Sequence, residues 1–534
     1  MMNDYSFSSD LSMDTSSSCP NTPEKDGVPV STESPRAKDW QRLLQMSDGY
    51  GDKNMFINDG IHGHIKIPGI CRAVIDTPQF DRLRGIKQLG TTFYVYPSAK
   101  HTSAKHIPGN QLGELGILFY DYPSANIPGK QLGTASYGYH SAKLIKYLYQ
   151  DKLCVMLAGL CHDLGHGPYS HLWEHFVSEA RPDNTWHHEQ SSIDMLDFLI
   201  QENNLWPIFM AYDFTNLDLI FIKELIYGPL PGSDGVFKGR GPEKHFLYEI
   251  VANKISSIDV DKWDYFLRDN MAMNIGLTFD YKRFICMSRL VEVDGKTRLA
   301  LADKEARSVE KLFEDRTRLH EHGYQHRVVK KIDRMYIDIL LSADRHVEIC
   351  VDREGKFVPL SEACNDMFVF SQLTDEFLFN TIRHSRTNAL KAARQIIHRI
   401  STRKLYKVVG LVGRSGSHIS QKFNEHQVSL NEFVLRANGS LSPEDLTLSL
   451  KRITSGLGRQ NPVEKVLFVN SKGQSRNYSS KYLKEIMPVE KETLLVILRR
   501  EGEEYRKEAV ELVRTWLRQS FEEEDYEISS SDRE

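Results

Sequence analysis

His162 and Asp163 stand side by side between the apolar stretch Leu153–Cys161 and a glycine-rich turn. An imidazole nitrogen together with a carboxylate oxygen suits Fe, Mn or Zn, and Mg when waters complete the ligand shell. Neighbouring side chains of a helix point about 100° apart, so these two reach one ion only where a helix ends. Three more histidines follow: His166, His171 and His175. This pattern favours a metal site over a simple helix cap.

Asp261, Tyr265 and Asp269 form a second group, at positions i, i+4 and i+8. Side chains at this spacing share one face of a helix, and Lys262 stands beside them. Two acids and a phenol on one stripe provide a metal ligand and two hydrogen-bonding groups for a substrate. A solvated polar face with Trp263 packed behind it explains the same pattern equally well.

Two further clusters carry weaker signals. Residues 185–190 contain His187 and His188, for which a polar helix start is the favoured interpretation. Residues 316–327 combine arginines and histidines with a single aromatic residue, Tyr324. Such a cluster suits an anion such as a polyphosphate, and an exposed helix face explains it equally well.

The elements that must hold these groups are mainly helices between about residues 40 and 400. Thr77 followed by Pro78 predicts a helix start, because threonine caps helices and proline is favoured at the first helical position. The stretch Leu153–Cys161 is apolar on nearly all sides, which predicts a buried helix. From about residue 405 the pattern predicts four strands and a closing helix: Val408–Val412, Leu446–Leu450, Val466–Val469, Thr493–Leu498, and a helix whose apolar stripe runs from Tyr505 to Trp516.

We therefore predict a mainly α fold, with a helical core and a smaller C-terminal α/β lobe. The predicted units are a disordered tail at 1–38, a helical catalytic domain at 39–404, the α/β lobe at 405–521 and an acidic tail at 522–534. Both tails are polar, and such a composition cannot bury enough apolar area to offset chain entropy. The helical unit also carries a repeated insertion at about 100–140, in which a motif beginning at Gln88 recurs at Gln111 and Gln131. We interpret it as a local tandem duplication.

Composition excludes several classes of protein. The 534 residues carry 68 Lys and Arg against 72 Asp and Glu, a formal charge of −4, which argues against a protein that coats nucleic acid. No apolar run approaches the roughly 18 residues that a membrane span needs. The seven cysteines are scattered and form no CxxC pair, which indicates free thiols in the cytosol or nucleus.

These strings together resemble the HD-domain family, and more closely the family of metazoan SAM- and HD-domain-containing deoxynucleoside triphosphate triphosphohydrolases. The likeness runs in order from about residue 55 to 345, and more faintly to about 515. We expect no counterpart of the SAM domain, because the N-terminal tail is too short to hold one. The matching strings lie at 58–65, 76–84, 86–90, 158–167, 188–190, 259–269 and 324–326.

The resemblance implies a metal held by two histidines and two aspartates, and an attack at the α-phosphorus that releases deoxynucleoside and intact triphosphate. Three of the ligands correspond to His162, Asp163 and Asp261, and the histidines that handle protons and the α-phosphate correspond to His166, His171 and His188. Phosphate-binding positions correspond to Lys262, Tyr265 and Arg316. Positions that read the sugar and the base correspond to Gln88, Leu89, Asp269, Tyr324 and Gln325.

The fourth ligand of the family ends a His-Asn-Arg-Phe-Glu-His motif. At the same offset from Gln88 this chain has His106, with Ser103 in place of the arginine and Lys105 in place of the acid. Spacing favours His106. His140 is the alternative, because a predicted helix start follows it.

The family also binds an activating guanine nucleotide, for which the corresponding residues are Asn58, Asp76 and Arg84, while Asp81 and Met55 depart from its pattern. The resemblance implies GTP or dNTP activators, Mg with the nucleotide, homotetramers and a nuclear rather than cytosolic setting. One alternative is a catalytically impaired nucleotide-binding protein. Another is a phosphodiesterase for cyclic nucleotides or single-stranded nucleic acid, which only the basic stretch Lys391–Lys407 supports.

Overall fold

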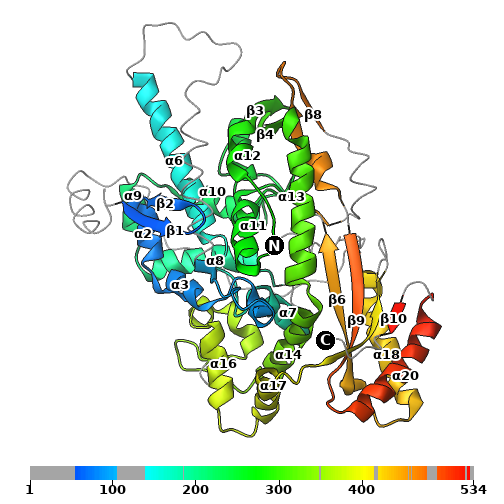
Figure 1. Cartoon of the computed structure of the whole chain (residues 1–534). Coiled ribbons are helices and arrows are strands. Elements are labelled where there is room, and N and C mark those ends of the chain that lie inside the picture. The colour runs from blue at the N-terminus through cyan, green and yellow to red at the C-terminus, as the bar shows by residue number, and fades with distance from the viewer. Residues whose placement is uncertain are drawn as a thin grey trace, which may run out of the picture.

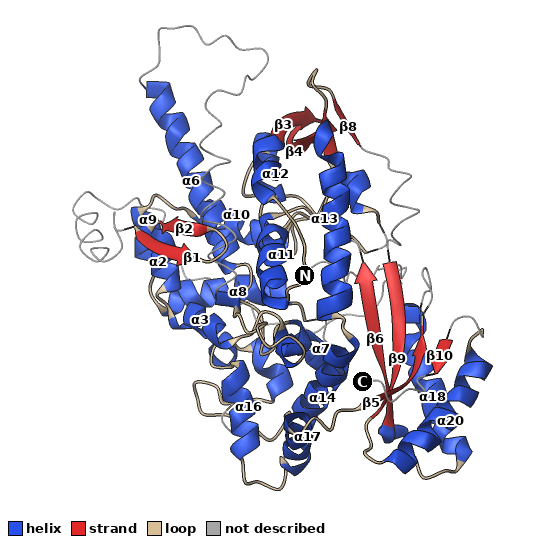
Figure 2. Cartoon of the chain, viewed as in Figure 1, coloured by secondary structure: helices blue, strands red, loops and turns tan. Residues whose placement is uncertain are grey.

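A computed structural model describes residues 54–104, 139–183, 186–347, 350–413, 419–454, 456–458, 460–477, 490–522 and 526–528, with backbone only for 139–148. The described chain is mainly helical with small sheets, which confirms the predicted fold class (Figures 1 and 2). The tail at 1–38, the second repeat and the third repeat up to residue 138 lie outside the described residues, and the backbone of residues 139–142 opens α6. None of the described helices is long and apolar enough to cross a bilayer.

Helices make up most of the described residues between 69 and 401, and the apolar faces of many of them meet in one large core. The predicted buried helix is the second half of α6, in which every residue from Leu153 to Cys161 is buried. The helices are α2 (Gly69–Ile75), α3 (Pro78–Asp81), α6 (Tyr139–Cys161), α7 (His171–Ala180), α8 (His188–Glu202), α9 (Trp206–Ala211), α10 (Asn216–Tyr227), α11 (Val260–Met273), α12 (Tyr281–Met287), α13 (Ala306–Leu319), α14 (Arg327–Ala343), α15 (Met367–Phe370), α16 (Asp375–His384) and α17 (Lys391–Ser401).

Two hairpins interrupt the helices, and the sequence pattern predicted neither of them. The first joins β1 (Met55–Asp59) to β2 (Gly63–Ile67). The second joins β3 (Ser288–Val293) to β4 (Lys296–Ala302), and it continues through β7 (Leu467–Val469) and β8 (Ser475–Asn477) in the order β3-β4-β7-β8. Because β4 pairs with β7 in parallel, a segment from the predicted C-terminal lobe completes a sheet of the helical part.

The other C-terminal strands form a second four-stranded sheet, in the order β10-β5-β9-β6. Its members are β5 (Lys407–Val412), β6 (Leu446–Thr454), β9 (Glu490–Leu498) and β10 (Tyr526–Ile528). Helices α18 (Phe423–Ala437) and α20 (Glu503–Ser520) pack on it around a separate apolar core, and β6 contacts α14 (Figure 1). All four predicted strands and the closing helix are present, and β10 falls within the predicted acidic tail.

Local signals account for the elements that carry the candidate site. The side chain of Thr77 accepts a hydrogen bond from the backbone N–H of Phe80 at 3.3 Å, and Pro78 opens α3 as predicted. Asp259 caps α11 in the same way, because its carboxylate accepts the N–H of Lys262 at 3.1 Å. Between α13 and α14 the chain makes a π-helical turn at His320–Tyr324, a distortion that is frequent at functional sites.

Candidate functional site

The end of α6 and the first turn of α11 bring three predicted metal ligands together. The Nε2 atom of His162 lies 3.3 Å from Oδ1 of Asp163 and 3.4 Å from Oδ1 of Asp261. All three side chains are buried, although 98 positions separate the two aspartates along the chain (261 − 163). The chain therefore gathers one imidazole and two carboxylates around a shared point.

The backbone fixes the orientation of His162. Its Nδ1 atom lies 2.6 Å from the carbonyl oxygen of Gly159, and because that oxygen only accepts, Nδ1 carries the hydrogen. In the neutral ring, Nε2 then presents a lone pair toward the two carboxylates. A nitrogen lone pair beside carboxylate oxygens is a donor set that a divalent cation stabilises, and a carbonyl behind the ligating histidine is its usual support. The residues present therefore fit a metal ion.

The turn after α6 packs against α8 without room for a side chain at Gly165. A Cβ atom there would lie 2.2 Å from the carbonyl oxygen of His188 and 2.4 Å from the backbone nitrogen of Ser192. The Ser192 hydroxyl accepts the N–H of Gly165 at 2.9 Å and donates to the carbonyl of His162 at 2.6 Å. The glycine thus allows α8 to pack against the turn that follows His162 and Asp163 and to hold that turn in place.

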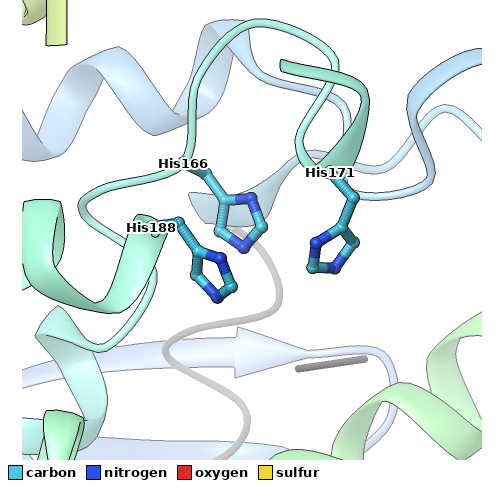
Figure 3. A group of neighbouring side chains, drawn as sticks. All are labelled: His166, His171 and His188. Carbon is cyan, nitrogen blue, oxygen red and sulfur yellow. The ribbon is translucent and has the colours of Figure 1, made fainter. Parts of the chain in front are cut away.

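Three histidines form a second cluster beside the first (Figure 3). The rings of His166 and His188 stack with centroids 4.6 Å apart, and the ring of His171 lies 4.9 Å from His166 and 5.4 Å from His188. One ring nitrogen of each lies within 4.8 Å of those of the other two, so the three could also hold a metal. His166 connects the two groups, because its Nε2 lies 3.3 Å from Oδ1 of Asp163.

Glu174 organises the histidine cluster, and the sequence analysis missed it. Its carboxylate lies 2.7 Å from Nδ1 of His188 and 3.4 Å from Nδ1 of His171. Burial opposes the charge on Glu174, but His188 and His171 hold the pKa of this carboxyl well below its usual range. Its position three residues after His171, in a segment with helical spacing, is the signal that could have identified it.

The two stacked rings are in opposite charge states. Burial lowers the pKa of His166 to about 4, with Asp163 opposing the change only in part. Burial also disfavours the charged form of His188, but Glu189 and Glu174 raise its pKa to about 9. At neutral pH, His166 is therefore a neutral imidazole and His188 an imidazolium, and environments that separate pKa values in this way are typical of paired acid and base roles.

The Asp261–Asp269 stripe is buried, so its alternative interpretation as a solvated face is wrong. The Tyr324 hydroxyl donates to Oδ2 of Asp269 at 2.5 Å, and Nε2 of His101 lies 2.8 Å from Oδ1 of the same carboxylate. Burial and Asp269 raise the pKa of Tyr324 well above its ordinary value, so the phenol keeps its proton. His101 is a second residue that the sequence analysis did not nominate, although it opens the stretch that carries the fourth-ligand motif.

The predicted phosphate-binding cations are held by the chain's own groups. Lys262 Nζ lies 3.2 Å from Oδ2 of Asp259, and the buried guanidinium of Arg316 donates to the carbonyl oxygen of Thr454 at the end of β6. Tyr265 is also buried.

Two predicted sugar readers lie beside the metal-side group. The Nε2 atom of Gln88 is 3.5 Å from Oδ2 of Asp163, so the sugar-reading segment reaches that group directly. Leu89 is buried next to it, and Gln325 follows the π-helical turn and is partly buried.

The predicted regulatory residues lie on elements other than those that carry the predicted ligands and histidines. Asn58, Asp76 and Arg84 are exposed on β1, at the end of α2 and in the 3₁₀ turn after α3. Asp76 also borders a pocket whose lining includes Asn203, Leu205 and Ile208, in the stretch from the end of α8 into α9.

The sequence also offered two candidates for the fourth ligand and a basic stretch at 391–407. His106 lies outside the described residues, as does the side chain of His140, so the fourth ligand stays a prediction. The basic stretch Lys391–Lys407 forms α17 and the start of β5, with Ala393, Ile397 and Ile400 buried and the cations mostly on the outer face.

A His-Asp pair at the end of a buried helix, a distant aspartate and flanking histidines together define an HD-domain protein. Deoxynucleoside triphosphate triphosphohydrolase SAMHD1 of Homo sapiens is 40% identical over 80% of this chain and 66% of its own length, and the Bos taurus protein is 39% identical over 81% and 73%. A mimivirus protein named for an HD domain is 28% identical over 68% of this chain and 76% of its own length. No model of a known protein family matches the chain. The chain spans about two thirds of the human relative, and it belongs to the SAMHD1 family of deoxynucleoside triphosphate triphosphohydrolases.

Proposed function

We propose that this chain hydrolyses deoxynucleoside triphosphates to deoxynucleoside and intact triphosphate, and so lowers cellular dNTP pools. One divalent ion (Fe, Mn or Zn) is held by His162, Asp163 and Asp261, with His106 as the fourth ligand, and Mg accompanies the nucleotide. The observation that carries the proposal is the convergence of His162 and Asp261 to 3.4 Å beside Asp163. Family membership supports the same reaction, because the relatives are named for it.

When bound, such an ion lowers the pKa of a coordinated water and offsets charge on phosphoryl oxygens. Imidazolium His188 stabilises negative charge at the α-phosphate, since Glu174 on Nδ1 turns Nε2 toward the cluster interior. His171 is half-buried and supplies a proton to the departing sugar oxygen. Neutral His166 places Nε2 3.3 Å from Oδ1 of Asp163, and this contact keeps that carboxylate directed at the centre.

Sugar recognition rests on a rigid, buried wall. Asp269 is fixed by Tyr324 and His101 and accepts the 3′-hydroxyl of the substrate. Leu89 and the Tyr324 ring leave no room for a 2′-hydroxyl, so ribonucleotides are excluded by contact rather than by a lost hydrogen bond. Gln88, whose Nε2 lies 3.5 Å from Oδ2 of Asp163, aligns the sugar with the reacting phosphorus.

Regulation takes place at a distance from the chemistry. A guanine nucleotide binds at Asn58, Asp76 and Arg84, and links copies of the chain into a homotetramer. The exposure of all three side chains in a single chain supports a site that a second copy completes.

The decisive experiment offers dGTP and GTP to the purified chain with Mg and with Mn, and measures deoxyguanosine and triphosphate by chromatography. We expect both products from dGTP and neither from GTP. Asp261→Asn should reduce turnover by at least about 100-fold. The matched control is Asp280→Asn, an exposed aspartate that caps α12 and should leave turnover unchanged.

A chain that turns over no dNTP with either metal would contradict the proposal. Nucleotide-dependent thermal stabilisation without turnover would identify the impaired nucleotide-binding protein instead. In that case, changing residues 101–106 toward the family motif should restore activity, and a failure to do so would argue against the impaired-enzyme explanation as well.

A further inference from the structure

A buried carboxylate that comes late in the chain connects two loops of the candidate site. Asp375 is the first residue of α16 and is fully buried. Its Oδ2 accepts the backbone N–H of Lys87 at 2.9 Å, and its Oδ1 accepts the backbone N–H of Tyr169 at 2.7 Å. Because each oxygen serves a different loop, the carboxylate fixes the spacing between them.

The first loop carries the sugar readers. Lys87 directly precedes Gln88 and Leu89, and its carbonyl oxygen accepts the hydroxyl of Ser170 at 2.9 Å. The peptide groups on both sides of Lys87 are thus tied to the second loop, one through Asp375 and one through Ser170. Any shift of Asp375 would move the residue that reaches Asp163.

The second loop carries the proton-handling histidine in a conformation that non-glycine residues avoid. Tyr169 has φ 62° and Ser170 has φ 55°, and His171 follows at once as the first residue of α7. Two consecutive positive φ values persist only where surrounding contacts hold them. The hydrogen bond from Tyr169 to Asp375 is such a contact.

A second set of hydrogen bonds joins the segment that contains Asp375 to the turn that follows α6. The buried guanidinium of Arg82 donates to the carbonyl oxygens of Leu373 at 3.0 Å, Leu164 at 3.2 Å and His166 at 2.6 Å. Leu373 is two residues before Asp375, so residues 373–375 are joined to the turn after α6 through Arg82 and to the turn before His171 through Asp375. The packing is close, since a Cβ atom at Gly85 would lie 2.7 Å from the side chain of Thr374.

We propose that Asp375 is a positioning residue that sets the sugar-reading loop relative to the turn bearing His171, and thereby couples sugar selection to turnover. The inference rests on the proposed triphosphohydrolase activity. In this proposal α16 controls both the rate and the preference for deoxyribose, although it touches no reacting atom. An amide in place of the carboxylate would set an N–H against one of the two backbone N–H groups, so one loop would lose its anchor.

The charge state of the group is compatible with this role. Burial raises the pKa of Asp375 to about 6. Lys87, whose Nζ lies 3.6 Å away, and the two backbone N–H donors oppose this rise. The carboxyl is therefore ionised at neutral pH, and both of its oxygens are acceptors.

The test compares Asp375→Asn with Asp344→Asn in the full chain. Asp344 is the matched control, because it is also buried and accepts a backbone N–H, that of Ser361 at 2.7 Å, away from the site. Steady-state kinetics with dGTP and GTP should show kcat for dGTP reduced about 10- to 100-fold in Asp375→Asn, and hydrolysis of GTP, which we do not expect from the native chain, should become measurable. Asp344→Asn should lower the melting temperature and leave both quantities unchanged.

If Asp375→Asn does not fold, Ser170→Ala removes the other tie to Lys87 and should shift kcat and the dGTP preference in the same direction by less. Hydrogen exchange gives a readout that needs no activity: the amides of Lys87 and Tyr169 should exchange faster in Asp375→Asn and not in Asp344→Asn. A wild-type chain without turnover would contradict the proposed function while leaving this readout available. Unchanged exchange at both amides, or unchanged kcat and dGTP preference in a folded and active Asp375→Asn, would overturn the inference.

Discussion

The predicted catalytic centre and the predicted regulatory surface are held in opposite ways. In the centre, most of the predicted side chains that the structure describes are buried, and contacts from distant parts of the chain hold them, such as Asp261 beside His162. On the surface, Asp76 pairs with Arg72 one turn earlier, at 3.1 Å, and Arg84 pairs with Asp81, at 2.8 Å. These local pairs are exposed and contribute little to stability.

This difference indicates what each region requires in order to act. The centre is built within one chain and is already pre-organised, so binding there is not expected to require rearrangement of its side chains. The surface presents charged groups whose contacts are exposed and weak, so a ligand or a second copy can take them over at low cost. We therefore expect substitutions in the centre to change chemistry or folding, and substitutions on the surface to change only regulation.

The largest effect is expected from Gly165→Ala. The new methyl group would press on backbone atoms of α8 only 2.2–2.6 Å away, which should lower the free energy of unfolding by about 3 kcal/mol or more and abolish turnover. Gly60→Ala is the control, because a Cβ atom there would have no other atom within 4 Å and the φ of Gly60 is ordinary. Denaturant unfolding measures both variants. A Gly165→Ala protein as stable as Gly60→Ala would show that the turn is not tightly packed.

Glu174→Gln should change the pH dependence of activity. Without this carboxylate the pKa of His188 falls, so the alkaline limb of the kcat profile should move down by about one unit or more. Glu179→Gln on the same helix is the control, since Glu179 pairs with Arg334 at 2.6 Å and not with the histidines. The measurement is kcat from pH 6 to pH 10 for both variants and the native chain. An alkaline limb that does not move in Glu174→Gln would show that the charge of His188 does not control turnover.

Stability should also depend on His188 over a defined pH range. Its pKa is raised to about 9 in the folded chain from an ordinary value of 6.5, so the charged ring stabilises the fold fully below pH 6.5. That contribution, up to about 3 kcal/mol, is lost as the pH rises through 9. Denaturant unfolding of the native chain and His188→Gln should therefore differ most at pH 6 and least at pH 10. His426→Gln, in the C-terminal lobe, should show no such loss, because burial lowers the pKa of His426.

The smallest effect on the enzyme itself is expected from Asp76→Ala. Its stability should change by less than about 0.5 kcal/mol, since only an exposed ion pair is lost. Basal dGTP turnover should be unchanged, whereas stimulation by added GTP should disappear. Asp197→Ala, which removes an exposed partner of Lys223, should keep the stimulation. Full GTP stimulation in Asp76→Ala would place the activator elsewhere.

Local patterns predicted the elements well where spacing alone decides them. The cap at Thr77, the buried half of α6, the face shared by Asp261 and Asp269, and the C-terminal strands all depend on short-range periodicity. The β1–β2 and β3–β4 hairpins were missed because their strands are half-buried and short, so their apolar alternation is weak. The parallel pairing of β4 with β7 was missed for another reason, since no local signal records a partner more than 160 residues away (467 − 300).

The residues of the candidate site also fall into those marked by local patterns and those that depend on long-range packing. His162 and Asp163 were found because they adjoin a helix end, and the remaining roles came from a resemblance between motifs. Glu174, His101 and Asp375 were missed because each acts by holding another residue, and that depends on the packing of distant segments. Only Glu174 had a local signal, its position three residues after His171 in a helical segment; the contacts of His101 and Asp375 depend on distant segments that spacing does not record.

Arg316 shows how far the centre extends beyond its own helices. Its guanidinium is fastened to the carbonyl at the end of β6, in a sheet that contains none of the proposed ligands or substrate readers. A protein cut before that strand would retain every residue proposed here for the reaction, yet this cation would lose its contact with Thr454. We therefore expect the smaller lobe to support triphosphate binding, and natural variation in it to alter catalysis without touching the nucleotide.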